Sequence, residues 1–132
     1  MLFLDLDGVR DGAKFFTGDF AVHYSFDEDN EPVVYLRTGT EAGDKNHTLL
    51  ADGVVTAVRS ITESGYVCEV AIPWSLLTNG TFSYSPSVNN SVGMTLLAID
   101  HDQTTTGGRQ IMWHGYGDSQ DNWGVLKFVS EE

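Results

Sequence analysis

The sequence predicts an all-β fold, an antiparallel β-sandwich, from three observations. Residues 66–72 alternate apolar and polar side chains, with Cys68 and Val70 on one face and Glu69 on the other, as in a half-buried strand. Residues 20–26 repeat this two-residue period. Glycine, aspartate and asparagine separate the apolar runs, and no helical period continues beyond about two turns. We therefore expect about eight strands in a layered, jelly-roll-like arrangement.

The first part of the chain predicts a short strand and a hairpin. Residues 1–6 form an apolar run that begins abruptly, so we expect a strand at an open sheet edge. Residues 20–26 and 33–37 bracket the charged turn at 27–32 and should pair as a hairpin. Residues 38–52 are polar, and we expect a long connection there.

The second part predicts another hairpin, around which the other strands should stack. Residues 53–61 and 66–72 flank a four-residue linker in which Gly65 would supply a positive φ. Pro73 should end the second strand because proline has no N–H to donate to a sheet. The run 92–100 is almost continuously apolar, so both of its faces should be covered. A loop is expected at 78–91, and further strands at 109–114 and 124–129.

Composition limits the class of protein. A chain of 132 residues fits one domain, residues 1–132, without disulfides as a staple, and we expect the one cysteine, Cys68, to be a small buried apolar residue. The formal charge of -12 should repel nucleic acid and anionic lipid surfaces. No apolar run is long enough to span a membrane, and no export signal is visible, so the compartment stays open.

One motif resembles a known family. Gly-Tyr-Val-Cys-Glu-Val-Ala-Ile-Pro-Trp at 65–74 is similar to Gly-Tyr-x-x-Glu-x-x-Ile-Pro-Trp of family 9 carbohydrate-binding modules and their DOMON-like relatives. Further matches keep the family's order, at Leu2-Phe3-Leu4-Asp5, Val92 to Asp100, Gly108-Arg109 with Met112-Trp113, and Trp123 to Phe128. The resemblance covers nearly all of the chain. It implies a non-catalytic sandwich, usually extracellular, that binds xylan or cellulose chains and carries structural calcium.

The resemblance also indicates where sugar would bind. Asp100 and Asp102 resemble polar sugar-reading positions, although a surface turn explains them equally well. Tyr116 lies where family members carry their second stacking tryptophan. Their first stacking aromatic precedes the segment equivalent to residues 2–5, so we expect this chain to lack it and to bind sugar weakly.

The residues themselves point to the same region. In an extended segment, Arg109 and Trp113 share one face, where a guanidinium can bind vicinal hydroxyls and an indole can stack on a sugar ring. The alternative is a buried tryptophan beside an arginine that reaches solvent. Trp74 and Trp123 are expected to pack in the core.

Acidic turns suggest a calcium site. Asp5, Asp7 and Asp11 in one loop, with Asp27 and Asp29 in another, could supply oxygen ligands if the two loops meet. Their spacing does not match an EF-hand, and solvated acidic turns are the alternative.

The sequence also suggests two other functions. Residues 2–9 match the nucleophile motif of haloacid-dehalogenase-like phosphatases, with Asp5 as nucleophile and Asp7 as acid and base. That chemistry needs a parallel sheet with crossover helices, so we expect no enzyme. Alternatively, the open edge at residues 1–6 would be capped by a second copy. This hypothesis predicts a homodimer, a scaffold that has lost sugar binding and serves as an oligomeric interaction protein.

Overall fold

The structure, a computed structural model, describes residues 1–100, 109–117 and 119–130. Eleven strands and two short 3-10 helices lie in these ranges. The elements are β1 (Leu2–Asp5), β2 (Asp19–Phe26), β3 (Pro32–Gly39), β4 (Lys45–Leu49), β5 (Thr56–Thr62), β6 (Gly65–Ala71), η1 (Trp74–Leu76), β7 (Thr78–Asn79), β8 (Phe82–Ser83), β9 (Ser91–Asp100), β10 (Arg109–Met112), η2 (Gln120–Asn122) and β11 (Gly124–Lys127). The predicted all-β class is confirmed.

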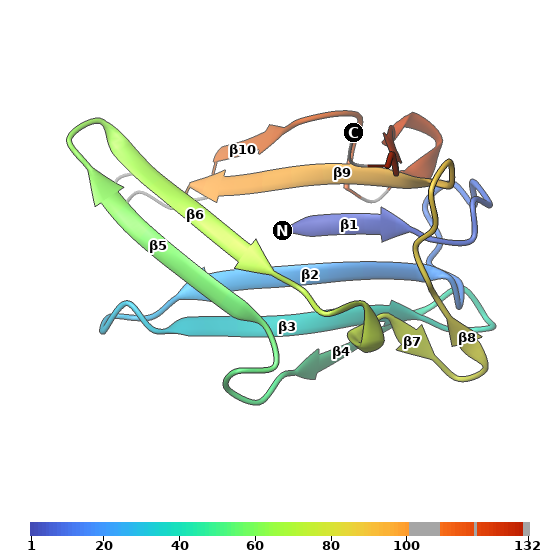
Figure 1. The fold of residues 1–132 in the computed structure, drawn as a ribbon, viewed down its shortest axis with the longest axis horizontal. Coiled ribbons are helices and arrows are strands. Elements are labelled where there is room, and N and C mark those ends of the chain that lie inside the picture. Colours follow the sequence, from blue (N-terminus) through green and yellow to red (C-terminus); the bar gives the residue numbers. More distant parts are fainter. Residues whose placement is uncertain (101–108, 118, 131–132) are drawn as a thin grey trace.

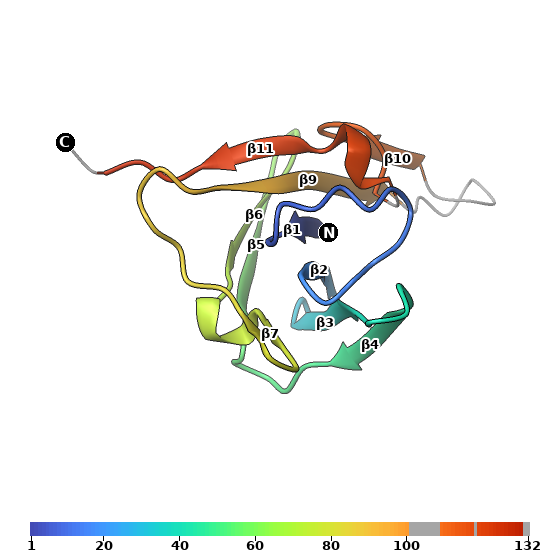
Figure 2. The same cartoon turned by 90° about the vertical axis from the view of Figure 1, so that its right-hand side faces the viewer.

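Seven strands form one large antiparallel sheet. Its order is β10-β9-β1-β2-β3-β4, and β11 also pairs with β9. The β5–β6 hairpin is a separate two-stranded layer that lies diagonally across one face of the large sheet (Figure 1). Seen end on, the connection between β1 and β2 lies on the other side of the sheet (Figure 2). The predicted sandwich is therefore present, with one large layer and one small layer.

The core lies on both faces of the large sheet because the side chains of β1 and β2 alternate. Leu4 and Phe20 are cross-strand partners and face the hairpin, together with Val22. Phe3 and its partner Ala21 face the opposite side, where Phe15 and Trp123 pack over them. The connections before β2 and before β11 thus cover the face of the large sheet that is opposite the hairpin.

The first strand is not the open edge that we expected. β1 pairs with β2 on one side and with β9 on the other, and Phe3, Leu4 and Asp5 are buried. The abrupt start of the apolar run reflects a central strand whose two faces are covered, not an edge. In the described part of the chain the outer strands of the large sheet are β4, β10 and β11.

The second hairpin, β5–β6, forms as predicted. It is not part of the large sheet but packs over one of its faces. Thr62 pairs with Gly65, so the turn has two residues, and Gly65 has the predicted positive φ, at +159°. The strand ends before Pro73, which has a φ of -67° and is the N-cap residue of η1. Tyr66 is exposed, whereas Val70 and Ile72 pack against the core.

The strand β4 was missed, because residues 38–52 were expected to be a loop. All five residues of β4 are exposed, so its sequence lacks the alternation of apolar and polar residues from which a strand is predicted. β4 forms because it pairs with β3, from Tyr35 and Leu49 to Gly39 and Lys45. The close approach at Gly39 is permitted by the missing side chain, since a Cβ there would lie 1.9 Å from the Phe16 carbonyl oxygen.

Candidate functional site

The most exposed tryptophan lies in the connection between β10 and β11, which we call the aromatic loop and which comprises residues 113–123. The side chain of Trp113 is 55% exposed, whereas that of Trp123 is 3% exposed. The Trp113 ring lies against the main chain of Gly124, where a Cβ would come within 2.6 Å of the ring. One side of the indole therefore rests on backbone, and much of the remainder faces solvent. This arrangement suits stacking on a sugar ring.

The aromatic loop is anchored by buried groups on both sides. The Trp123 indole N–H donates to the Tyr116 carbonyl at 2.8 Å, and the Thr95 hydroxyl donates to the His114 carbonyl at 2.6 Å. Gly115 has a φ of +63°, and a Cβ there would lie 2.5 Å from the Asn122 carbonyl oxygen. These contacts fix the loop while the Tyr116 side chain stays 75% exposed. The described residues of the loop, 113–117 and 119–123, thus present two exposed aromatic rings from a backbone held by these contacts.

The other predicted sugar-site residues are described only in part. Arg109 is the cross-strand partner of Asp100 at the ends of β10 and β9, but the side chains of both lie outside the described residues. Asp102 lies wholly outside them. The structure brings Trp113 and Tyr116 into one anchored loop, and the contribution of the polar residues stays a prediction.

The other two tryptophans were expected to pack in the core, which is correct for Trp123 but wrong for Trp74, whose side chain is 39% exposed. Trp123 is buried beside Phe3, with ring centroids 5.6 Å apart. Trp74 is partly exposed and packs against Tyr84 and Phe128. Trp113 is therefore the tryptophan with the largest open surface.

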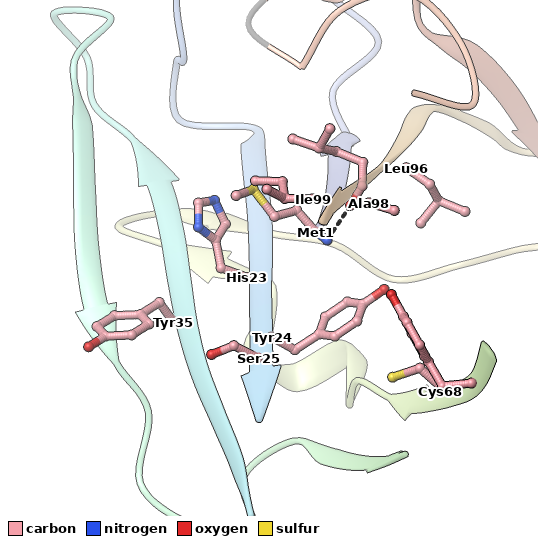
Figure 3. Close-up of a pocket in the computed structure, with 11 residues that line it drawn as sticks. Met1, His23, Tyr24, Ser25, Tyr35, Cys68, Leu96, Ala98 and Ile99 are labelled. Carbon is pink, nitrogen blue, oxygen red and sulfur yellow. Dashed lines mark hydrogen bonds between the residues drawn. The ribbon is translucent and has the colours of Figure 1, made fainter. Parts of the chain in front are cut away.

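A pocket that the sequence did not predict opens beside Met1. This feature, which we call the slot, has a volume of about 540 Å³ and lies between β2 and β9, next to Met1 (Figure 3). Tyr24 points from β2 toward Cys68 of β6, which closes one side of the slot. It is lined by Met1, His23, Tyr24, Ser25, Tyr35, Tyr66, Cys68 and residues 96–99. No single strand carries a signal for it, because its lining comes from Met1 and from four strands, β2, β3, β6 and β9.

The lone cysteine is therefore placed differently from the prediction. Cys68 is half-buried at the wall of the slot and is not a core residue. Burial nevertheless raises the pKa of its thiol, so the thiolate is disfavoured.

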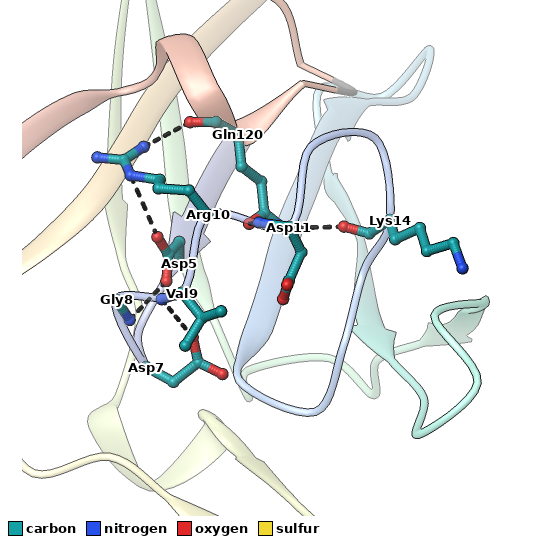
Figure 4. A network of polar contacts seen from close by, with 8 residues as sticks. All are labelled: Asp5, Asp7, Gly8, Val9, Arg10, Asp11, Lys14 and Gln120. Atoms are coloured by element: carbon teal, nitrogen blue, oxygen red, sulfur yellow. Dashed lines mark hydrogen bonds and ion pairs between the residues drawn. The ribbon is translucent and has the colours of Figure 1, made fainter.

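A polar network surrounds the beginning of the β1–β2 connection (Figure 4). Asp5 and Asp19 are cross-strand partners, and both are fully buried. The Arg10 guanidinium lies 3.6 Å from the Asp5 carboxylate, which also accepts the Gly8 N–H at 2.7 Å. Burial raises the pKa of both carboxyl groups, that of Asp19 to about 7. The Arg10 guanidinium thus faces Asp5, and burial makes both carboxyl groups resist ionisation.

The buried Gln120 joins this network to the aromatic loop. Its side chain donates to the Lys14 carbonyl at 2.9 Å and accepts the Asp11 N–H at 3.1 Å. Its main-chain carbonyl accepts a hydrogen bond from the Arg10 guanidinium at 2.5 Å. The network therefore has a structural role, tying residues near the start of the chain to η2.

The two acidic turns proposed as one calcium site do not meet. Asp5 adjoins the beginning of β2, whereas Asp27 and Asp29 follow its end, so the eight residues of β2 separate them. This corrects the expectation that Asp5, Asp7, Asp11, Asp27 and Asp29 share one ion. The Asp11 carboxylate is also directed away from the Asp5–Arg10 pair (Figure 4). No group of three or more His, Cys, Asp or Glu residues suited to a metal occurs in the described ranges.

The phosphatase interpretation fails on geometry. All the strand pairs that the structure describes are antiparallel, so the parallel sheet of that enzyme class is missing from this part of the chain. The expected nucleophile, Asp5, is fully buried and engaged by Arg10 and Gly8. A phosphate ester could not reach it.

Comparison with known proteins gives one match. The model of a family described as carbohydrate family 9 binding domain-like matches residues 3–131, nearly the whole chain. Neither a curated protein nor a solved structure matches the chain significantly. Among the described residues, no helix is both long enough and apolar enough to cross a membrane.

Proposed function

Because the chain belongs to the carbohydrate family 9 binding domain-like family, and is therefore a carbohydrate-binding module, we propose that it binds xylan- or cellulose-type chains weakly through its aromatic loop. The family is one of non-catalytic binding modules, and the proposal extends this property to the chain: it recognises a saccharide without transforming it.

The exposed ring of Trp113 carries this proposal. A sugar presents an apolar ring face that stacks on an aromatic side chain, and polar groups around the ring read its hydroxyls. Trp113 supplies the aromatic face, and the exposed residues Gln110, His114 and Asn122 lie on the same segment. Arg109, Asp100 and Asp102 are proposed as further hydroxyl-binding residues.

The affinity should be weak because few groups are positioned in advance. Trp113 and Tyr116 are exposed from one loop, whereas Phe3, Phe15 and Trp123 are buried in the core. A site with one or two stacking rings and mobile polar side chains must order those side chains on binding. We expect dissociation constants in the millimolar range.

Titration with xylobiose and cellobiose tests the proposal. Binding should shift the tryptophan fluorescence, and calorimetry should then compare the wild type with Trp113→Ala. Loss of the stacking contact should weaken binding by roughly tenfold, the equivalent of about 1.4 kcal/mol.

Trp74→Ala is the matched control. Trp74 is also partly exposed, but it packs against Tyr84 and Phe128, away from the aromatic loop. Its variant should retain the wild-type affinity. The proposal is wrong if millimolar sugar leaves the fluorescence unchanged, or if the two variants lose affinity equally.

A second candidate function is that of an oligomeric interaction protein without sugar binding. It is favoured by the outer strand β4, whose five residues are all exposed along one edge of the large sheet. An outer strand can pair with a second copy, although Lys45 makes such pairing less favourable. This candidate predicts a homodimer. Light scattering at micromolar concentrations that gives the mass of a monomer would refute it.

A further inference from the structure

A second pocket, which we call the cleft, lies between the ends of two hairpins. One wall is the end of the β3–β4 hairpin, and the other wall is the β7–β8 hairpin, which lies beside it (Figure 1). The cleft has a volume of about 680 Å³, within the range of roughly 300–1,000 Å³ that is typical of ligand pockets. Six of its lining residues have polar side chains, namely Thr17, Thr40, Glu41, Asn46, Asn79 and Thr81. The cleft is therefore predominantly polar.

Asn79 holds the two walls of the cleft together. Its side-chain amide donates to the Gly39 carbonyl at 2.6 Å and to the Thr17 carbonyl at 3.3 Å. From the same hairpin, Phe82 packs against the buried Phe20, with ring centroids 5.9 Å apart. Since both strands of the β7–β8 hairpin are fixed in this way, the shape of the cleft is preorganised, and little ordering is needed when a ligand binds.

The lining also presents hydrogen-bonding groups to a ligand. Both hydrogen bonds of Asn79 use its N–H groups, so its amide oxygen is the group that can accept a bond from a ligand. The Thr40 hydroxyl accepts the Asp44 N–H at 3.0 Å, and its own hydrogen can be donated. Glu41 and Asn46 are exposed and add a carboxylate and an amide. Donors and acceptors are thus mixed around one cleft.

This mixture determines the class of ligand. Glu41 is the one charged residue among the described residues that line the cleft, so an anionic ligand would be repelled. A divalent cation would need several oxygen ligands at one point, and no group of three or more His, Cys, Asp or Glu residues suited to it occurs in the described ranges. An apolar ligand would leave the hydroxyl and amide groups without hydrogen bonds. A neutral ligand rich in hydroxyl groups can pair with them, because each hydroxyl both donates and accepts.

We propose that the cleft is a second saccharide-binding site, which takes a short neutral sugar through its hydroxyl groups. This site goes beyond the proposed function, because it uses neither Trp113 nor any other residue of the aromatic loop. The aromatic loop joins two strands that pair with β9, whereas β4 is an outer strand beyond β1, β2 and β3 (Figure 2). Four strand spacings, or roughly 19 Å, therefore separate β9 from β4. A disaccharide is shorter than this separation, so each site should bind its own.

Titration of the isotope-labelled protein with xylobiose, followed by amide chemical shifts, tests the proposal. The amide signals of Thr40, Asn79 and Gly80 should shift with a dissociation constant in the millimolar range, and Trp113→Ala should leave that constant unchanged within about twofold. In the same variant the signals of the aromatic loop should shift less at equal sugar concentration. The two sites can thus fail separately. In the wild type, shifts at the cleft without shifts at the loop support this inference and refute the proposed function, and the reverse result refutes this inference alone.

Two threonine variants provide the matched comparison. Thr81→Trp should fill the cleft and abolish the shift of Thr40, whereas Thr62→Trp, the same change at an exposed position of β5 outside the cleft, should retain it. Equal shifts in the two variants would overturn the proposal, and so would equal shifts from glycerol at the same hydroxyl concentration, because the cleft would then show no preference for a sugar. Glu41→Gln, an exposed substitution, keeps the test valid if Thr81→Trp fails to fold. It should weaken xylobiose binding at the cleft by about threefold, and an unchanged affinity would likewise overturn the proposal.

Discussion

Substitution of Asp19 by asparagine should make the protein more stable at neutral and alkaline pH. Asp19 is fully buried opposite Asp5, and burial raises the pKa of its carboxyl group from 3.8 to about 7. Its Oδ2 accepts the Phe16 N–H at 2.6 Å, a contact that the amide oxygen of asparagine can keep. The variant therefore removes the ionisation with little change in shape.

The sign follows from the two pKa values. Below about pH 4 the carboxyl group is protonated in both the folded and unfolded protein, so it does not favour unfolding. Between about pH 4 and pH 7 the unfolded chain ionises while the folded chain stays protonated, and the free energy of unfolding falls. Above pH 7 the loss is complete. A difference of about three pKa units, at about 1.4 kcal/mol each, gives an upper limit of about 4 kcal/mol.

Urea denaturation from about pH 4 to pH 8 measures this effect. The stability of Asp19→Asn relative to the wild type should rise across this range by up to about 4 kcal/mol, and then stay level. Some pH dependence should remain in the variant, because burial also raises the pKa of Asp5. Asp52→Asn, an exposed substitution between β4 and β5, is the control and should follow the wild type. Parallel curves for Asp19→Asn and the wild type would refute a protonated buried carboxyl group.

Three further predictions concern the frame of the site. Gln120→Ala removes two hydrogen bonds from a fully buried side chain and should lower the free energy of unfolding by about 2–4 kcal/mol, whereas the exposed Asn122→Ala should change it by less than about 0.5 kcal/mol. Gly39→Ala places a Cβ against the Phe16 carbonyl and should lower the melting temperature, which thermal denaturation measures; an unchanged value would show that the backbone yields at low cost. Because the structure does not bring Asp5, Asp7 and Asp11 together around one ion, the melting temperature should be equal with calcium and with chelator, and a higher value with calcium would contradict this reading.

The local sequence determined most of the strands. The two-residue period predicted β2 and β6, the charged turn predicted the β2–β3 hairpin, and Pro73 marked the end of β6. These signals are readable because each depends on neighbouring residues and on one buried face. The motif at residues 65–74 identified the family, which the match over residues 3–131 confirmed.

The tertiary structure alone decided which strands are central, because neighbours in a sheet are chosen by residues far apart in sequence. The sequence of β1 predicted an edge strand, but β1 lies between β2 and β9. The polar β4 forms only through its pairing with β3. The two acidic turns are separated by the length of β2. A one-dimensional pattern records which side chains prefer burial, whereas strand order and relative length depend on long-range hydrogen bonds that no local pattern encodes.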